Sequence, residues 1–178
     1  ATKTAKKAKK LDIKALESKE EIKQDYVVDI ENEDNTKKRE IITINIGGCG
    51  VNMGDMLMQQ YCKEHNVSYY SGKSLNKQYN PKSSGIFEET MNGTYIGRTI
   101  NIDTDPYGIN YIKNVGGKVY NSRNLISSKT DSHKVYSVGY DTNIDSVNNA
   151  IRKEVESCDN IQGFNINHSY SGGTGSGF

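Results

Sequence analysis

The sequence lacks the features that define several large classes of protein. No apolar run approaches the ~18 residues that a membrane-spanning helix needs, so we expect no membrane span. Only three cysteines are present, Cys49, Cys62 and Cys158, and they form no CxxC pair. This argues against a disulfide framework or a zinc site and favours reduced thiols in an intracellular setting. The formal net charge of +1 implies no general attraction to nucleic acid.

The charge that is present is unevenly distributed. Residues 1–10 contain five lysines and no acid, whereas residues 17–34 are largely acidic. We interpret residues 1–38 as a charged N-terminal tail, partly helical around residues 11–22 and otherwise disordered. The alternative to a solvated tail is that these lysines contact nucleic acid or another polyanion. An organellar presequence is disfavoured because the run contains no arginine. The remainder, residues 39–178, suits a single domain.

The most informative segment is SGGTGSGF at residues 171–178, which follows a strand-like run at 164–169. Consecutive glycines let backbone N–H groups approach an anion closely, and the hydroxyls of Thr174 and Ser176 add donors. A flexible Gly/Ser linker is the alternative interpretation. A second glycine loop elsewhere in the fold would favour a phosphate cradle.

Such a loop occurs near residue 47. Residues 41–46 alternate between apolar and polar types and then run into GGCG and a helical stretch at 51–64. The spacing GxGxxxG from Gly48 to Gly54 does not match the dinucleotide fingerprint, and the expected ribose-binding acid is missing. The Walker pattern fails as well, because no Lys-Ser/Thr pair follows the last glycine of residues 171–178. Phosphate would therefore be held by backbone donors and a metal.

A pair of acids supplies ligands for that metal. Asp103 and Asp105 follow a strand-like run at 98–102. In extended geometry, residues i and i+2 point to the same face, so both carboxylates can converge on one Mg²⁺. The alternative is a solvated Asp turn ahead of Pro106.

The coarse order of elements predicts an α/β fold with a Rossmann-like layered sheet. After the first strand and helix we expect an irregular stretch at 65–93, a strand, a short helix at 107–114, a loop, a helix at 143–156 and a final strand. Ligands in such sheets bind beyond the carboxyl ends of the strands. The two glycine segments and the acid pair all lie at such ends.

Three segments, REIITINIGGCGVNMG, NIDTDP and IQGFNINHSYSGGTGSGF, resemble the tubulin family in this order. The resemblance leans toward the α-type through residues 61–65, 151–153 and 161–164 and the closing GSGF. It covers residues 39–178, weakly between 66 and 97, and implies part of a tubulin-type GTP-binding domain, the N-terminal half of the tubulin GTPase domain. It also implies GTP or GDP with Mg²⁺ as cofactors, and a role in a microtubule-type cytoskeletal polymer in the cytoplasm. The implied partners are other tubulin-type subunits or a larger protein assembly. The lack of a long apolar run predicts no membrane partner, and the N-terminal lysines are the one indication of a nucleic-acid contact.

The resemblance also implies which residues contact the nucleotide. Asp103 and Asp105 would reach the Mg²⁺ and γ-phosphate region. Asn52, where the family usually has Gln, would face the nucleotide. The two phosphate-holding loops would comprise Gly47, Gly48, Cys49 and Gly50 in the first, and Ser169, Gly172, Gly173, Thr174 and Gly175 in the second.

Several positions depart from the family pattern. Gly48 stands where the family commonly has Gln beside the metal, and Ser171 replaces a usual glycine. Lys134 stands where an Asn pair is normal, and it either supplies positive charge to a phosphate or marks a degraded site. The resemblance stops before the base-binding residues and before the acid that triggers hydrolysis in a neighbouring subunit. We therefore assign no catalytic residue and leave enzyme activity open. The alternative function is a truncated, non-polymerising relative that acts as a structural subunit without GTP turnover.

Overall fold

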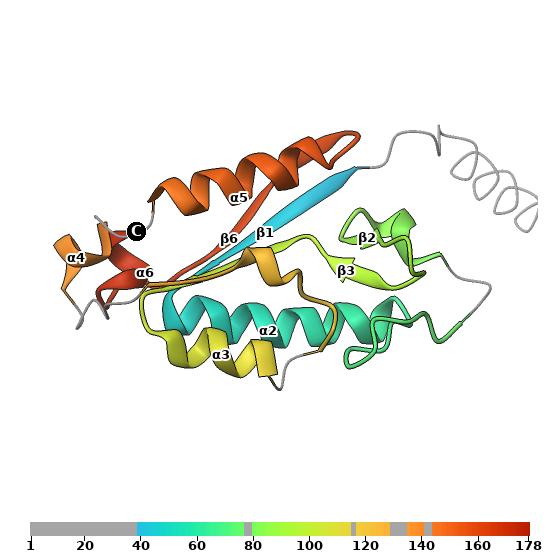
Figure 1. Cartoon of the computed structure of the whole chain (residues 1–178), viewed down its shortest axis with the longest axis horizontal. Coiled ribbons are helices and arrows are strands. Elements are labelled where there is room, and N and C mark those ends of the chain that lie inside the picture. Colours follow the sequence, from blue (N-terminus) through green and yellow to red (C-terminus); the bar gives the residue numbers. More distant parts are fainter. Residues whose placement is uncertain (1–38, 77–79, 115–116, 129–134, 141–143) are drawn as a thin grey trace, which may run out of the picture. The chain divides into compact units, whose positions relative to one another are not determined.

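A four-stranded parallel sheet carries the fold, with its strands in the order β5-β4-β1-β6 (Figure 1). Because all neighbouring strands run in the same direction, their carboxyl ends meet at one edge of the sheet. The predicted α/β class with a layered sheet is confirmed. The strands are β1 (Glu40–Ile46), β4 (Thr99–Asp103), β5 (Leu125–Ser127) and β6 (Ile161–Asn167).

The computed structural model describes residues 39–178 except 77–79, 115–116, 129–134 and 141–143. The described residues belong to one unit, Lys38–Phe178. The predicted tail at residues 1–38, with its helix at 11–22, lies outside the described residues.

Helices cover both faces of the sheet. Helix α5 (Ile144–Glu156) lies on one face, and helices α2 (Gly47–Glu64) and α3 (Pro106–Asn114) lie on the other (Figure 1). The face toward α5 is apolar, because the isoleucines of β1 and β4 alternate onto it. The principal core there consists of Ile42, Ile44, Ile100, Ile102, Val147 and Ala150.

The opposite face of the sheet carries a buried row of asparagines. Asn45 on β1 is in register with Asn101 on β4 and with Asn167 on β6. Asn45 donates to the Asn101 Oδ1 over 2.8 Å and accepts from the Asn167 Nδ2 over 2.8 Å. Asn45 and Asn101 are both 0% exposed. The polar positions of the alternating run at 41–46 therefore face helix α2 and hold three strands in register.

Helix α2 crosses this polar row at very short distance. A Cβ atom at Gly54 would lie 2.2 Å from the Asn45 Cγ, and one at Gly50 would lie 2.2 Å from the Asn167 carbonyl oxygen. Glycines four residues apart lie on the same side of a helix. The Gly50–Gly54 spacing that failed as a dinucleotide fingerprint is therefore explained by close packing of the helix on the sheet.

The predictions fail mainly at short elements. The stretch at 65–93 contains the 3-10 turn η1 (Pro81–Ser84) and strand β2 (Phe87–Glu89), which pairs antiparallel with β3 (Tyr95–Gly97). This hairpin is held by Phe87, which packs with Met58 and Cys62 of α2. The expected loop beyond residue 114 contains η2 (Ser122–Asn124), β5 and α4 (Tyr136–Tyr140), and α6 (Thr174–Gly177) ends the described chain. Elements of three to five residues carry too little periodicity to be recognised, whereas the helices expected at 107–114 and 143–156 are confirmed.

We predict that Gly54→Ala destabilises the domain by about 1–3 kcal/mol or more, because the new methyl group overlaps the hydrogen-bonded Asn45 amide. The matched control is Gly163→Ala on β6, where a Cβ meets nothing within 4 Å. The control should change the free energy of unfolding by no more than about 0.5 kcal/mol. Urea denaturation measures both, and equal stabilities would contradict the packing argument.

Candidate functional site

A hollow of about 480 Å³ lies at the carboxyl ends of β1, β4 and β6. The last residue of β4 and the segments that follow the three strands contribute all of its lining, and they are far apart in the sequence. The lining residues are Gly48, Cys49, Asp103, Asp105, Ser169, Ser171, Gly172, Gly173, Thr174 and Gly175. The structure therefore brings the two glycine segments and the acid pair to one place.

The first glycine segment is the opening turn of helix α2 and not a separate loop, because the helix begins at Gly47. No side chain caps this end, and its first turn contains no acid. The first N–H groups of a helix lack partners within the helix, and together with the helix dipole they favour a bound anion. Gly48 and Cys49 present this turn to the hollow.

The other predicted residues of this segment have different positions. Gly47 has a φ of +73°, and a Cβ there would lie 2.9 Å from the backbone nitrogen of Gly175. Gly47 and Gly50 are buried, so close packing accounts for Gly50, and packing together with the positive φ accounts for Gly47. Asn52 is exposed on α2 and is not among the residues that line the hollow. Lys134 lies outside the described residues.

The two acids are aligned by a turn and not by strand alternation, because β4 ends at Asp103. The backbone N–H of Asp105 donates to the Asp103 Oδ1 over 3.2 Å. The Asp105 Oδ1 accepts from the backbone N–H of Tyr107 over 2.9 Å, which caps helix α3 just before its first residue, Pro106. Both carboxylates line the hollow, as predicted, although the strand geometry invoked for them is wrong.

The Asp103 carboxylate is poorly compensated. Burial raises its pKa, and the charge of Asp105 raises it further, whereas the backbone N–H groups of Asp105 and Thr104 and the Thr174 hydroxyl lower it. A cation in the hollow would stabilise the ionised form. Within the described ranges, no group of three or more His, Cys, Asp or Glu side chains is placed to hold a metal. Two carboxylates without a third fit Mg²⁺, which keeps water and phosphate oxygens among its ligands.

A hydrogen-bonded chain joins the acid turn to the second glycine segment. The Thr174 hydroxyl is hydrogen-bonded both to the Asp103 carboxylate and to the Thr104 hydroxyl, and all three side chains are buried. An ionised carboxylate only accepts, so Thr174 donates to Asp103 and Thr104 donates to Thr174. Thr104 was not predicted as a site residue. Its only signal in the sequence is a hydroxyl between two acids.

Local hydrogen bonds shape the second glycine segment itself. The Ser169 Oγ donates to the Ser171 carbonyl over 2.7 Å, and the His168 Nδ1 lies 2.9 Å from the Gly175 carbonyl oxygen. Gly172 has a φ of +95°, a conformation that favours glycine. Ser171 lines the hollow although the sequence analysis treated it only as a departure from a glycine.

A parallel sheet whose strand ends carry glycine turns and acids is the arrangement of α/β proteins that bind phosphorylated ligands. Comparison with known proteins agrees. The family model described as Tubulin/FtsZ family, GTPase domain, matches residues 40–178. The chain therefore belongs to the Tubulin/FtsZ family, as the resemblance predicted.

Similar proteins include both principal tubulin types. The tubulin alpha chain of Encephalitozoon cuniculi is 39% identical over 79% of this chain and 33% of its own length. The tubulin beta chain of Saccharomyces cerevisiae is 35% identical over 78% of this chain and 32% of its own length. The chain thus spans about a third of the length of these curated relatives. No helix within the described ranges combines the length and apolar character needed to cross a bilayer.

We predict that Thr104→Val loosens the second glycine segment. Removing one hydroxyl from a buried chain of donors should cost about 1–2 kcal/mol of unfolding free energy. It should also speed hydrogen exchange at Gly177 and Phe178, whose N–H groups bond back to Gly173 and Thr174. Thr104→Ser keeps the hydroxyl and should preserve this protection. Equal exchange in the Val and Ser variants would show that the hydroxyl chain does not support the segment.

Proposed function

We propose that this domain binds GTP or GDP together with Mg²⁺ in the hollow, as the nucleotide-binding part of a microtubule-type cytoskeletal polymer in the cytoplasm. The observation that carries the proposal is the convergence of three groups on one hollow: an uncapped helix end, a glycine segment and two carboxylates. Backbone donors suit phosphate oxygens, and the acids suit a metal that shares those oxygens. The preference for guanine comes from the family, whose model describes a GTPase domain.

Each group has a defined task under this proposal. Backbone N–H groups of Gly48 and Cys49, and of the segment from Gly172 to Gly175, would hold phosphate oxygens. Asp103 and Asp105 would hold Mg²⁺, which neutralises phosphate charge when bound.

Thr174 connects the two tasks. It has one hydroxyl proton, which Asp103 accepts in the structure described here. If Thr174 donates that proton to a phosphate oxygen instead, the Asp103 carboxylate loses a hydrogen-bond donor. A metal ion can then bind the carboxylate in its place. Nucleotide and metal should therefore support each other's binding.

A structural subunit without GTP turnover is the second candidate function, and Gly48 favours it. A Cβ at Gly48 would meet only the Asp103 Oδ2, at 3.7 Å, so packing does not demand glycine there. With glycine at this position, residue 48 offers no side chain to a metal beside Asp103. We propose no catalytic residue, and hydrolysis would depend on groups from elsewhere.

Partners would cover the outer side of β6, the edge strand of the sheet. Phe164 and Ile166 are in register with Ile42 and Ile44, on the apolar face, yet they are 48% and 55% exposed. Exposed apolar side chains on an open strand edge favour association. We propose that other tubulin-type subunits, or a larger protein assembly, cover this edge.

We predict that natively purified protein releases close to one GTP or GDP per chain when it is denatured, as quantified by ion-exchange chromatography. We also expect Mg²⁺ to strengthen nucleotide binding roughly tenfold or more, about 1.4 kcal/mol, in fluorescence titrations with and without EDTA. Asp103→Asn should remove most of that Mg²⁺ effect, and Gly163→Ala should retain it. If the purified protein carries no nucleotide and also fails to bind added nucleotide, the structural-subunit function becomes the leading one.

We further predict that the isolated chain self-associates and that the double variant Phe164→Ser, Ile166→Thr reduces this association. Two large apolar side chains would be removed from the open edge without touching the hollow. Sedimentation velocity over a concentration series measures the effect. A wild-type chain that stays monomeric throughout the series would refute the need for a covering partner.

A further inference from the structure

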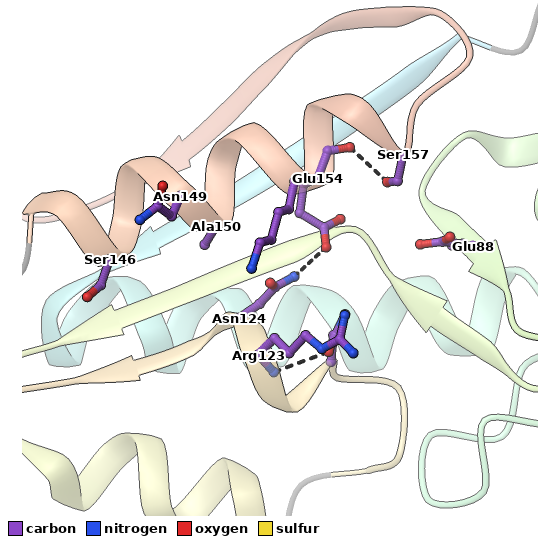
Figure 2. Close-up of a pocket in the computed structure, with 10 residues that line it drawn as sticks. Glu88, Arg123, Asn124, Ser146, Asn149, Ala150, Glu154 and Ser157 are labelled. Atoms are coloured by element: carbon purple, nitrogen blue, oxygen red, sulfur yellow. Dashed lines mark hydrogen bonds between the residues drawn. The ribbon is translucent and has the colours of Figure 1, made fainter.

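A second cavity, of about 280 Å³, lies at the amino ends of β4 and β5 and shares no lining residue with the hollow. It is enclosed by α5 on one side and by η2 on the other, and Glu88 approaches from a third direction (Figure 2). Ala150 is the one apolar residue in its lining. The volume falls just below the ~300–1,000 Å³ typical of pockets for drug-sized ligands. The cavity therefore suits a smaller, polar molecule.

The base of this cavity is a buried acid. Glu154 is 6% exposed, and its Oε1 accepts from the Asn124 Nδ2 over 2.7 Å (Figure 2). The same amide nitrogen also donates to the Thr99 carbonyl over 3.1 Å, so both of its protons are used. Among the described residues, no other hydrogen bond and no ion pair to the Glu154 carboxylate is found.

The nearest buried cation is already engaged. Arg98 forms an ion pair with Glu40 at 2.7 Å, with both side chains almost fully buried, and donates to the Ser157 Oγ over 2.9 Å. Burial raises the pKa of Glu154. The Asn124 hydrogen bond lowers it, the charge of Glu88 raises it, and Arg98 lowers it. A buried carboxylate without its own cation is costly, and a positively charged group beside it would offset that cost.

Two cations lie on the rim of the cavity, together with Glu88, whose half-buried carboxylate lies 3.8 Å from the Arg98 guanidinium. Arg123 and Lys153 both line the opening and are exposed to solvent. Neither forms an ion pair among the described residues. A ligand with a positive group only would meet these two cations on its way in. A ligand with a positive group at one end and a negative group at the other would match both the base and the rim.

We propose that this cavity binds a small zwitterion of amino-acid size, with its ammonium group on Glu154 and its carboxylate against Arg123 and Lys153. The site is independent of the hollow and does not rest on nucleotide binding. Polar contacts would dominate its binding, because the lining offers almost no apolar surface.

The test is an NMR titration of the full chain with amino acids of increasing length: β-alanine, 4-aminobutanoate and 6-aminohexanoate. The reporters are the backbone amide of Ala150 and the side-chain amide of Asn124. Saturable shifts should appear, with one chain length preferred, because the ligand must span from the buried Glu154 to the cations of the rim. Butylamine lacks the carboxylate and butyrate lacks the ammonium, and each should bind roughly tenfold more weakly or worse. The ionic strength is matched in all titrations.

Two variants identify the contacts. Glu154→Gln keeps an oxygen for Asn124 but removes the charge, and should weaken binding of the preferred amino acid roughly tenfold or more. Arg123→Gln changes a surface residue, where folding is not at risk. It should weaken binding of the preferred amino acid without weakening binding of butylamine. Glu156→Gln is the matched control on α5, since Glu156 is exposed and outside the lining, and it should bind like the wild type.

Three results would overturn the proposal. The first is the absence of saturable shifts up to about 100 mM, well above the millimolar range in which weak ligands bind. The second is unchanged binding by a folded Glu154→Gln variant. The third is equal binding of butylamine and 4-aminobutanoate, which would leave the rim cations without a role.

Discussion

The close approach of helix α2 to the sheet is the constraint on which the rest of this domain depends. It requires glycine at positions 50 and 54, where any side chain would overlap the Asn167 carbonyl or the Asn45 amide. The helix also buries the asparagine row beneath it. The asparagines hydrogen-bond to one another, which avoids the cost of burying amides without partners. Together these features place the first turn of α2 at the strand ends, so that Gly48 faces Asp103. A looser helix would separate the uncapped N–H groups from the acids.

The two ends of the sheet share one electrostatic feature, a buried carboxylate whose pKa is raised by burial. Asp103 occupies this position at the carboxyl end and Glu154 at the amino end. Because the folded state holds the proton more tightly than the unfolded chain, each ionised group lowers stability at neutral pH. That loss is recovered as pH falls through the folded-state pKa. A bound cation would offset the same cost at constant pH, which is why both places suit positively charged ligands.

The composition of the site could be predicted more fully than its geometry. The lining of the hollow includes both predicted acids, Gly48, Cys49 and all the predicted residues of the second glycine segment. Asn52 is not part of the lining, and Gly47 and Gly50 have packing roles, because a helix starting at Gly47 turns these positions away from the hollow. Thr104 could not have been found from the sequence, since its role arises from contact with Thr174, which lies 70 residues further along the chain.

By itself the sequence determined the family, the α/β class, the long elements and the meeting of three motifs at the strand ends. The family follows from the resemblance of three segments to tubulins. The class, the long elements and the meeting of the motifs follow from local periodicity and from the rule that parallel strands end at one edge of the sheet. The tertiary structure decided the β2–β3 hairpin, strand β5, the turn that aligns Asp103 with Asp105, and the cavity around Glu154. Strand β5 and the cavity depend on contacts between distant segments. The hairpin and the Asp103–Asp105 turn are local, but they are too short to show a recognisable periodicity. A local sequence pattern does not indicate which buried polar group will have a hydrogen-bonding or charged partner. It also does not indicate which group, like Glu154, will line a cavity.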